Sequence, residues 1–399
     1  MNAPILSNMR INLPTAAGKL ETFVLSEPRA YPDKATGAFN RLALAAAHVV
    51  ADASAANDPW LDCAIDWDKT IATREYLWDL GLGVAEAMDT AQRGMGLDWP
   101  TSLQLIGRAT RAATAWEARN GRTALIFCGC GTDHLDPAEV RSVDDVIRAY
   151  EEQMAAIEAL GGRLIVMASR ALARIAKSAS DYERVYSRVL AQAKDPVIMH
   201  WLGEMFDPAL AGYWGSDDHG RAMQTAAGII KANAVKVDGI KISLLDKDKE
   251  ITMRRQLPAG VRMYTGDDFN YAELIAGDAQ GYSDALLGIF DAIAPAASAA
   301  LSALAAGDRQ QFDAIFEPTV PLSRHIFKAP TRFYKTGVVF MAYLNGLQDH
   351  FVMIAGQQSA RSLPHLAELF RLADRAGARR DPDLARRRMV RVLAIHGIA

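Results

Sequence analysis

The sequence has little cysteine: only Cys63, Cys128 and Cys130 occur among its 399 residues. Three clustered cysteines are too few for the disulfide framework of a secreted protein. The pair at 128 and 130 also lacks the second pair that would complete a zinc site. The scarcity of cysteine therefore predicts a reduced, cytoplasmic setting.

Long apolar runs and long basic runs are missing as well. No uncharged stretch approaches the roughly 20 residues that span a bilayer, and the first residues lack the charged start and apolar run of a signal peptide. The formal net charge is −3, and no basic run is interleaved with aromatic residues. The arginine-rich stretch 375–391 is typical of a solvated helix face. We therefore expect no membrane and no nucleic acid among the partners.

The remaining composition, 50% hydrophobic and 23% charged, is that of a globular protein. Residues 8–26 alternate loosely around a small-residue segment at 15–18, which predicts a β-hairpin. From about residue 40 onward, short apolar runs alternate with amphipathic stretches of helical length, as in repeated βα units. The predicted strands cover residues 45–50, 84–88, 124–128, 163–168, 197–202, 239–243, 261–265 and 285–289.

Eight successive βα units close most naturally into a TIM-type (β/α)8 barrel of the α/β class. An open doubly wound sheet usually has fewer strands and a G-x-G-x-x-G loop, and no such loop follows the first predicted strand. Beyond residue 295 the pattern predicts helices alone. We expect an N-terminal extension at 1–40, a barrel at 41–300 and a helical region packed on the barrel at 301–399. The alanine-rich start of that region suits a homo-oligomer.

Reactive side chains of such barrels lie at the carboxyl ends of the strands. Lys241 stands out because it lies within the apolar stretch 237–243, where burial of an ammonium ion is costly. Desolvation lowers the pKa of a lysine, so its neutral amine can attack a carbonyl and form an iminium. An inward lysine paired with Asp267 or Glu204 is the alternative. The other polar candidates at strand ends are His48, Asp52, Glu86, Asp89, Thr90, Asp133, His134, Ser169, Arg170, His200, Ser243 and Asp268.

Three segments resemble one superfamily in order and spacing. The strand Asp238-Gly-Ile-Lys-Ile-Ser243 resembles the G-I-K-[ED]-[AS]-[ST] strand of the dihydrodipicolinate synthase and N-acetylneuraminate lyase superfamily, whose lysine forms a Schiff base with a 2-oxo acid. Tyr264-Thr-Gly-Asp-Asp268 is similar to its [LY]-[ST]-G-D-D strand, and residues 284–295 are similar to its D-G-x-I-S-x-x-A-N-x-x-P segment. The motifs match over about 195–306, and the first four strands match by order alone. The chain looks most like an uncharacterised branch of this superfamily, a family of unknown function.

The resemblance implies catalytic roles for Lys241 as the nucleophile and for His200, which falls where the superfamily has a proton-relaying tyrosine. It also implies that Ser243, Tyr264 and Gly266 contact substrate, and it requires no cofactor and no metal.

The superfamily's G-[TS]-T-G-E loop, which holds the substrate carboxylate, is replaced here by residues 88–92. Only Thr90 matches, as a residue that orients substrate. Asp89 beside a bound carboxylate would be repulsive, so a 2-oxo acid and a keto-sugar derivative both stay open as substrates.

The hypothesis that follows is a Schiff-base lyase that cleaves, condenses or dehydrates a small keto acid or keto sugar. One alternative is a divalent-metal-dependent isomerase, epimerase or hydrolase whose ligands are the strand-end His, Asp and Glu residues. The sequence contains no compact ligand motif such as H-E-x-x-H that would support this alternative. A non-catalytic binding barrel would leave Lys241 paired and unreactive.

Overall fold

The computed structural model describes residues 9–398, and these form two compact units. The barrel unit contains residues 41–47 and 82–288. The helical unit contains the described part of residues 1–40 together with 48–81 and 289–398. This grouping differs from the expected boundaries at 40 and 300, because helix α2 (Trp67–Asp79) groups with the C-terminal helices. Within the helical unit, Ser298 Oγ donates to the carbonyl of Leu80, and Lys69 pairs with Asp349 at 3.0 Å.

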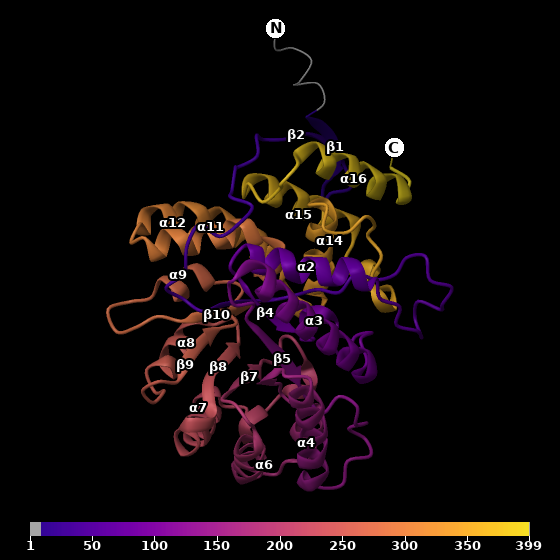
Figure 1. Ribbon diagram of the computed structural model, residues 1–399. Helices are drawn as coiled ribbons and strands as arrows, with labels where there is room; N and C mark the ends of the chain where they lie inside the picture. The colour runs from indigo at the N-terminus through magenta and orange to yellow at the C-terminus, as the bar shows by residue number, and fades with distance from the viewer. Residues whose placement is uncertain (1–8, 399) are drawn as a thin grey trace. The chain divides into compact units, whose positions relative to one another are not determined.

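The barrel unit holds eight parallel strands that close in the order β10-β3-β4-β5-β6-β7-β8-β9. Figure 1 labels β4, β5, β7, β8, β9 and β10 of this barrel. The predicted TIM barrel is therefore confirmed, and every predicted strand overlaps an observed one. Strand β7 is buried at all six positions, which explains why both faces of these strands are apolar. The strands are β3 (Ala43–Ala46), β4 (Gly83–Glu86), β5 (Ile126–Cys130), β6 (Arg163–Val166), β7 (Val197–Leu202), β8 (Val237–Ser243), β9 (Arg262–Thr265) and β10 (Asp284–Leu287).

Side-chain capping fixes where several helices of the barrel unit begin. Ser142 and Asp145 form a reciprocal capping box, and Asp218 accepts the N–H of Arg221. Gly161 follows Leu160, the C-cap of α4, with a positive φ of 78°. The helices are α3 (Trp99–Asn120), α4 (Val143–Ala159), α5 (Arg170–Ile175), α6 (Ala179–Gln192), α7 (His219–Ala232), α8 (Lys247–Arg254) and α9 (Tyr271–Ala276), with short 3₁₀ turns η1 (Asp89–Ala91), η2 (Pro208–Leu210), η3 (Tyr213–Gly215) and η4 (Ala234–Lys236).

The barrel interior is filled by alternate residues of its strands. A fully buried cluster joins side chains from seven strands, and its members include Leu44, Ala85, Phe127, Ile165, Ile198, Tyr264 and Leu286. Because side chains alternate along a strand, residues two positions nearer the carboxyl ends face the same interior. His200 follows Ile198 in this way. The apolar cluster therefore lies directly beneath the interior positions that carry polar candidates such as His200.

The helical unit begins with the predicted hairpin. Strand β1 (Arg10–Pro14) pairs antiparallel with β2 (Leu20–Val24) across a turn closed by the N–H of Thr15 and the carbonyl of Lys19. No helix within residues 9–398 is both long and apolar enough to cross a bilayer. The remaining helices are α10 (Ile289–Ala292), α11 (Ala294–Ala305), α12 (Arg309–Phe316), α13 (Val320–Ile326), α14 (Tyr334–Leu344), α15 (Leu363–Arg375) and α16 (Pro382–Ile395), with turns η5 (Glu317–Thr319), η6 (Thr331–Phe333) and η7 (Ile354–Ala360).

The arginine-rich stretch 375–391 is not simply a solvated face. Arg379 is buried against Asp374, and Arg388 is buried where its Nη1 donates to the carbonyls of Tyr343 and Gln348. The sequence interpretation is wrong for these two residues. The carbonyls that cover Arg388 lie 45 and 40 residues away in the chain, whereas Asp374, the partner of Arg379, lies only five residues away. The charge pattern of the stretch does not show that either arginine is buried.

Glu250 on α8 is a buried carboxyl group in the barrel unit, with a relative exposure of 1%. Its Oε1 accepts a 2.7 Å hydrogen bond from Ser283 Oγ. Burial raises its pKa from an ordinary 4.5 to about 8. The folded protein therefore holds a proton on Glu250 that the unfolded chain releases above pH 4.5.

We expect Glu250→Gln to make the stability of the protein less sensitive to pH. Between pH 4.5 and about 8 the folded wild type binds more protons than the unfolded chain, so its free energy of unfolding falls with rising pH by up to about 1.4 kcal/mol per unit. Urea denaturation at pH 5 and pH 8 measures this slope, with the exposed Glu183→Gln as the matched control. Parallel pH dependence of wild type and Glu250→Gln would contradict the assignment.

Candidate active site

Lys241 lies in the middle of the barrel, on β8. Its backbone is in register with His200 on β7 and with Tyr264 on β9. Gly239 shares its strand face, and a Cβ at Gly239 would lie 2.6 Å from a ring carbon of Tyr264 in the interior cluster. The Lys241 side chain therefore points into the barrel, where it is 8% exposed.

Gly266, directly after β9, leaves the space that the Lys241 side chain occupies. A Cβ at Gly266 would lie 2.8 Å from Lys241 Cε and 2.3 Å from Ser243 Oγ. These distances are shorter than van der Waals contact, so a larger residue would displace one of the two side chains. The structure thus brings the predicted residues Lys241, Ser243 and Gly266 together.

Burial is the main influence on the charge of Lys241. It lowers the pKa of the amine, and the nearby carboxylates of Asp268 and Asp89 oppose that change. The two carboxylates of the paired-lysine alternative are engaged elsewhere. Asp267 accepts the N–H groups of Phe269 and Asn270, and Glu204 pairs with His219 at 3.6 Å. The geometry favours an amine that can lose its proton.

His200 is buried beside Lys241. Its Nε2 lies 3.3 Å from Ser243 Oγ, and its Nδ1 has no hydrogen-bond partner among residues 9–398. Burial, and next the charge of Lys241, hold the pKa of His200 well below its usual value. The imidazole is therefore neutral near pH 7, with one ring nitrogen able to donate and the other to accept.

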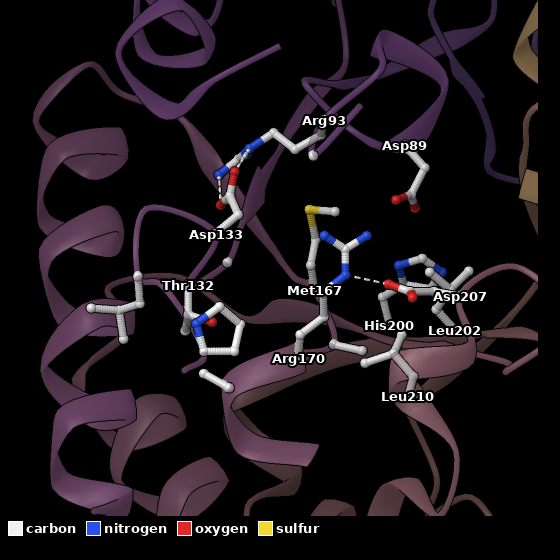
Figure 2. Close-up of a pocket in the computed structure, with 16 residues that line it drawn as sticks. Asp89, Arg93, Thr132, Asp133, Met167, Arg170, His200, Leu202, Asp207 and Leu210 are labelled. Carbon is white, nitrogen blue, oxygen red and sulfur yellow. Dashed lines mark hydrogen bonds and ion pairs between the residues drawn. The ribbon is translucent and has the colours of Figure 1, made fainter. Parts of the chain in front are cut away.

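A pocket of about 120 Å³ opens among the loops that follow β4 to β7 (Figure 2). His200 and Asp89 line this pocket, and Lys241, which lies outside the lining itself, interacts electrostatically with both. The lining residues include Asp89, Arg93, Gly94, Thr132, Asp133, Met167, Arg170, Leu202, Asp207 and Leu210.

Arg93, which the sequence did not indicate as a site residue, connects two loops of the pocket. Its Nε and Nη2 donate to both oxygens of Asp133 at 2.8 and 2.6 Å, and Nη2 also donates to Gln153 Oε1. Its Nη1 donates to the carbonyl of Gly129 at 2.8 Å. A buried bidentate pair of this kind fixes geometry, so Arg93 holds the loops after β4 and β5 in place.

The loop after β6 is fixed by hydroxyl groups. Thr132 Oγ1 and Ser169 Oγ lie 2.6 Å apart, and the Ser169 N–H donates to the hydroxyl of Tyr213. The Tyr213 hydroxyl lies 2.9 Å from that of Tyr186. Burial raises the pKa of both tyrosines, so they remain neutral hydrogen-bonding groups. The two tyrosines come from α6 and η3, and no strand-end rule indicates them.

Of the predicted substrate residues, Asp89 and Thr90 lie in η1 after β4, with Asp89 on the pocket and Thr90 buried beside it. Tyr264 needs correction. Its hydroxyl donates to Asp238 at the start of β8, so the ring points toward the amino ends of the strands and supports the core. The alternation of side chains along the strand indicated that Tyr264 faces the barrel interior, but not that its ring points toward the amino ends of the strands. We therefore leave Tyr264 out of the candidate site.

The candidates of the metal-dependent alternative are dispersed. His48 pairs with Asp291 at 2.6 Å within the helical unit, and His134 Nδ1 contacts Gln153 at 2.9 Å in the barrel unit. In the part of the chain that the structure describes, no three His, Cys, Asp or Glu side chains are grouped as ligands for a metal ion. The candidate site is therefore built on Lys241 and His200.

The chain matches a known protein family over nearly all of its length. The family described as "Protein of unknown function (DUF993)" matches residues 11–398. The chain belongs to the DUF993 family. The expected assignment to a family of unknown function is therefore confirmed. A search among curated proteins finds no match to this DUF993 chain.

Solved structures similar to the DUF993 protein include dihydrodipicolinate synthases. The Thermotoga maritima enzyme is 13% identical, with a TM-score of 0.62 over 85% of this chain and 99% of its own. The Acinetobacter baumannii enzyme, in complex with pyruvate, is 17% identical, with a TM-score of 0.61 over 84% and 99%. The Aquifex aeolicus enzyme is 12% identical, with a TM-score of 0.61 over 84% and 97%. At these identities the likeness confirms the expected fold.

We expect Gly266→Ala to destabilise the DUF993 protein by about 1–3 kcal/mol, because the new methyl group would overlap Lys241 and Ser243. Gly228→Ala is the matched control. Gly228 lies on an exposed face of α7 with no atom near its ideal Cβ, so alanine there should stabilise by up to about 1 kcal/mol. Urea denaturation compares the two, and equal effects would show that the space around Lys241 is not tight.

Proposed function

We propose that this DUF993 protein is a Schiff-base-forming lyase in which Lys241 attacks the carbonyl of a small keto acid or keto sugar. The observation that carries the proposal is the buried Lys241 amine beside neutral His200, next to an open pocket. Burial favours the neutral, nucleophilic amine. The similarity in fold to dihydrodipicolinate synthases, one of them in complex with pyruvate, supports a carbonyl substrate.

The chemistry follows from that amine. Lys241 Nζ forms a bond to the carbonyl carbon, and the carbonyl oxygen leaves as water after it gains two protons, which gives an iminium. In aldol cleavage, a base removes the proton of the β-hydroxyl group. The bond between the α- and β-carbons then breaks, the β-carbon leaves as the carbonyl carbon of an aldehyde or ketone, and the electron pair of the bond moves through the α-carbon to the iminium nitrogen. Protonation of the resulting enamine and hydrolysis release the ketone and restore Lys241, so no cofactor is required.

His200 is proposed to move the protons of this sequence. Its Nδ1 is without a partner among residues 9–398, and its Nε2 faces Ser243 Oγ at 3.3 Å. A neutral imidazole can accept a proton at one nitrogen and release one from the other. This exchange adds little net charge next to Lys241, where a second cation would be unfavourable.

Asp89 is proposed to select the substrate. It is close enough to Lys241 to stabilise the ammonium ion, so it borders the place where a bound carbonyl compound would lie. A carboxylate next to the carbonyl would be repelled there, whereas a hydroxyl group could donate to Asp89. Of the two substrate classes, this favours a keto-sugar derivative over a simple 2-oxo acid. Homo-oligomeric assembly and a cytoplasmic location stay predictions from the sequence.

Borohydride trapping tests the proposal directly. With a panel of 2-oxo acids and keto sugars, we expect the wild type to gain the mass of one compound less one oxygen atom, on the peptide that contains Lys241. Lys241→Ala should abolish this adduct, whereas Lys249→Ala, which removes a partly exposed lysine paired with Asp246, should keep it. Circular dichroism verifies that both variants fold. Equal trapping by Lys241→Ala, or no adduct with any compound, would refute the Schiff-base mechanism.

The pH dependence of trapping tests the role of Asp89. The rate should rise with pH as Lys241 loses its proton, with a midpoint below that of a free lysine, because burial lowers the pKa. Asp89→Asn removes a group that raises the pKa of Lys241, so its midpoint should move to lower pH. Cyanoborohydride trapping from pH 5 to pH 10 measures both, with the exposed Asp144→Asn as control. A midpoint that moves upward in Asp89→Asn would show that Asp89 does not act on Lys241.

A further inference from the structure

Arg170 is a partly exposed arginine on the wall of the pocket. It is the first residue of α5, and its side chain is 45% exposed. Its Nε donates to the carboxylate of Asp207, which also lines the pocket. Neither Nη1 nor Nη2 has a hydrogen-bond partner among residues 9–398. One edge of the guanidinium is therefore held, and the other can still donate.

The surroundings of Arg170 fix its position. Ser169, the residue before it, bonds to Thr132 and Tyr213, and its Oγ accepts the N–H of Leu172. Asp207 is held in turn because its Oδ1 accepts the N–H of Ala209 at the start of η2. A guanidinium whose backbone and one edge are fixed loses little freedom on binding a ligand.

The free edge of Arg170 points into the pocket. Figure 2 shows Nε of the guanidinium joined to Asp207 and the two terminal nitrogens at the opposite end, in the space that Asp89 also borders. A Cβ at Gly94 would lie 3.2 Å from Nη1, so a side chain at that position would obstruct it. The chain thus leaves this edge accessible.

Arg93, the other arginine of the pocket, cannot take the same role. Its Nε and both terminal nitrogens already donate to Asp133, Gln153 and backbone carbonyls, and it is buried. Among the described lining residues, Arg170 is the arginine with terminal N–H groups to spare. Planar guanidinium groups of this kind bind carboxylates and phosphates through paired hydrogen bonds.

We propose that Arg170 binds an anionic group of the substrate, a carboxylate or a phosphate, at the end remote from the carbonyl that Lys241 attacks. This rests on the proposed function and defines its substrate class. Asp89 disfavours a carboxylate at the carbonyl end, and Arg170 accepts a negative charge at the far end. The substrate is then a keto-sugar acid or a keto-sugar phosphate, with hydroxyl groups between the two ends.

Three ketoses that differ only at carbon 6 test this class. D-Fructose is neutral there, D-fructose 6-phosphate carries a phosphate, and D-fructuronate carries a carboxylate. We expect borohydride trapping of wild type to reach half-saturation at a concentration at least about 10-fold lower for one anionic probe than for D-fructose. The preferred probe then identifies phosphate or carboxylate as the natural group.

Arg170→Met should remove this preference, so that the three probes trap at similar concentrations. The matched control is Arg184→Met, because Arg184 is an exposed arginine paired with Asp144 on the outer helices. It should keep the wild-type preference. A charge preference that survives in Arg170→Met, or trapping of all three probes by wild type without preference, would overturn the assignment of Arg170 and leave the Schiff-base mechanism intact.

Binding without a carbonyl separates this proposal from the lyase mechanism. D-Glucitol 6-phosphate and D-gluconate cannot form a Schiff base, so titration calorimetry with these probes measures anion binding alone. We expect one of them to bind wild type about 10-fold or more tightly than Arg170→Met. Binding that is equal in both proteins, or absent from wild type, would overturn the role of Arg170 whether or not Lys241 traps a ketose.

Discussion

The closure of eight parallel strands is the constraint on which the rest of the site depends. Closure by pairing β10 with β3 places one face of every strand in a packed interior. A charged side chain on that face pays a desolvation cost unless its surroundings compensate. At Lys241 the compensation is partial, because Asp268 and Asp89 favour the ammonium ion while burial opposes it. A lysine in this balance retains access to its neutral form.

The pocket above Lys241 is organised by hydrogen bonds between loops. Arg93 and Asp133 join the loops after β4 and β5, and Thr132 and Ser169 join those after β5 and β6. Each loop is thus hydrogen-bonded to the next one, and these bonds fix the backbone that carries the pocket's side chains. Such support is what a site needs to hold reacting atoms in place.

Much of the fold was predictable from the sequence. The eight strands are short apolar runs at regular spacing, and the motif around Lys241 indicated the residue that the structure buries. The direction of Tyr264 was not predictable, because alternation along a strand gives a face without the tilt of the side chain. Arg93 was missed and Arg388 was misread because their partners come from distant segments. Arg379 was misread although its partner Asp374 is only five residues away, because the sequence does not show that both side chains are buried. The local sequence shows that a charged side chain is present, but it does not show whether a carbonyl group from another segment accepts its hydrogen bonds.

The attachment of the N-terminal hairpin has a consequence during synthesis. Arg371 donates to the carbonyls of Leu13 and Pro14, and Asp374 accepts both the N–H and the hydroxyl of Ser26. These partners lie 358, 357 and 348 residues apart in the chain. At ribosomal rates of about 5–20 residues per second, the hairpin waits roughly 20–70 s for them. Until then the hairpin lacks these partners and the edges of its strands are open to other chains, so faster synthesis shortens the period in which the hairpin can pair wrongly.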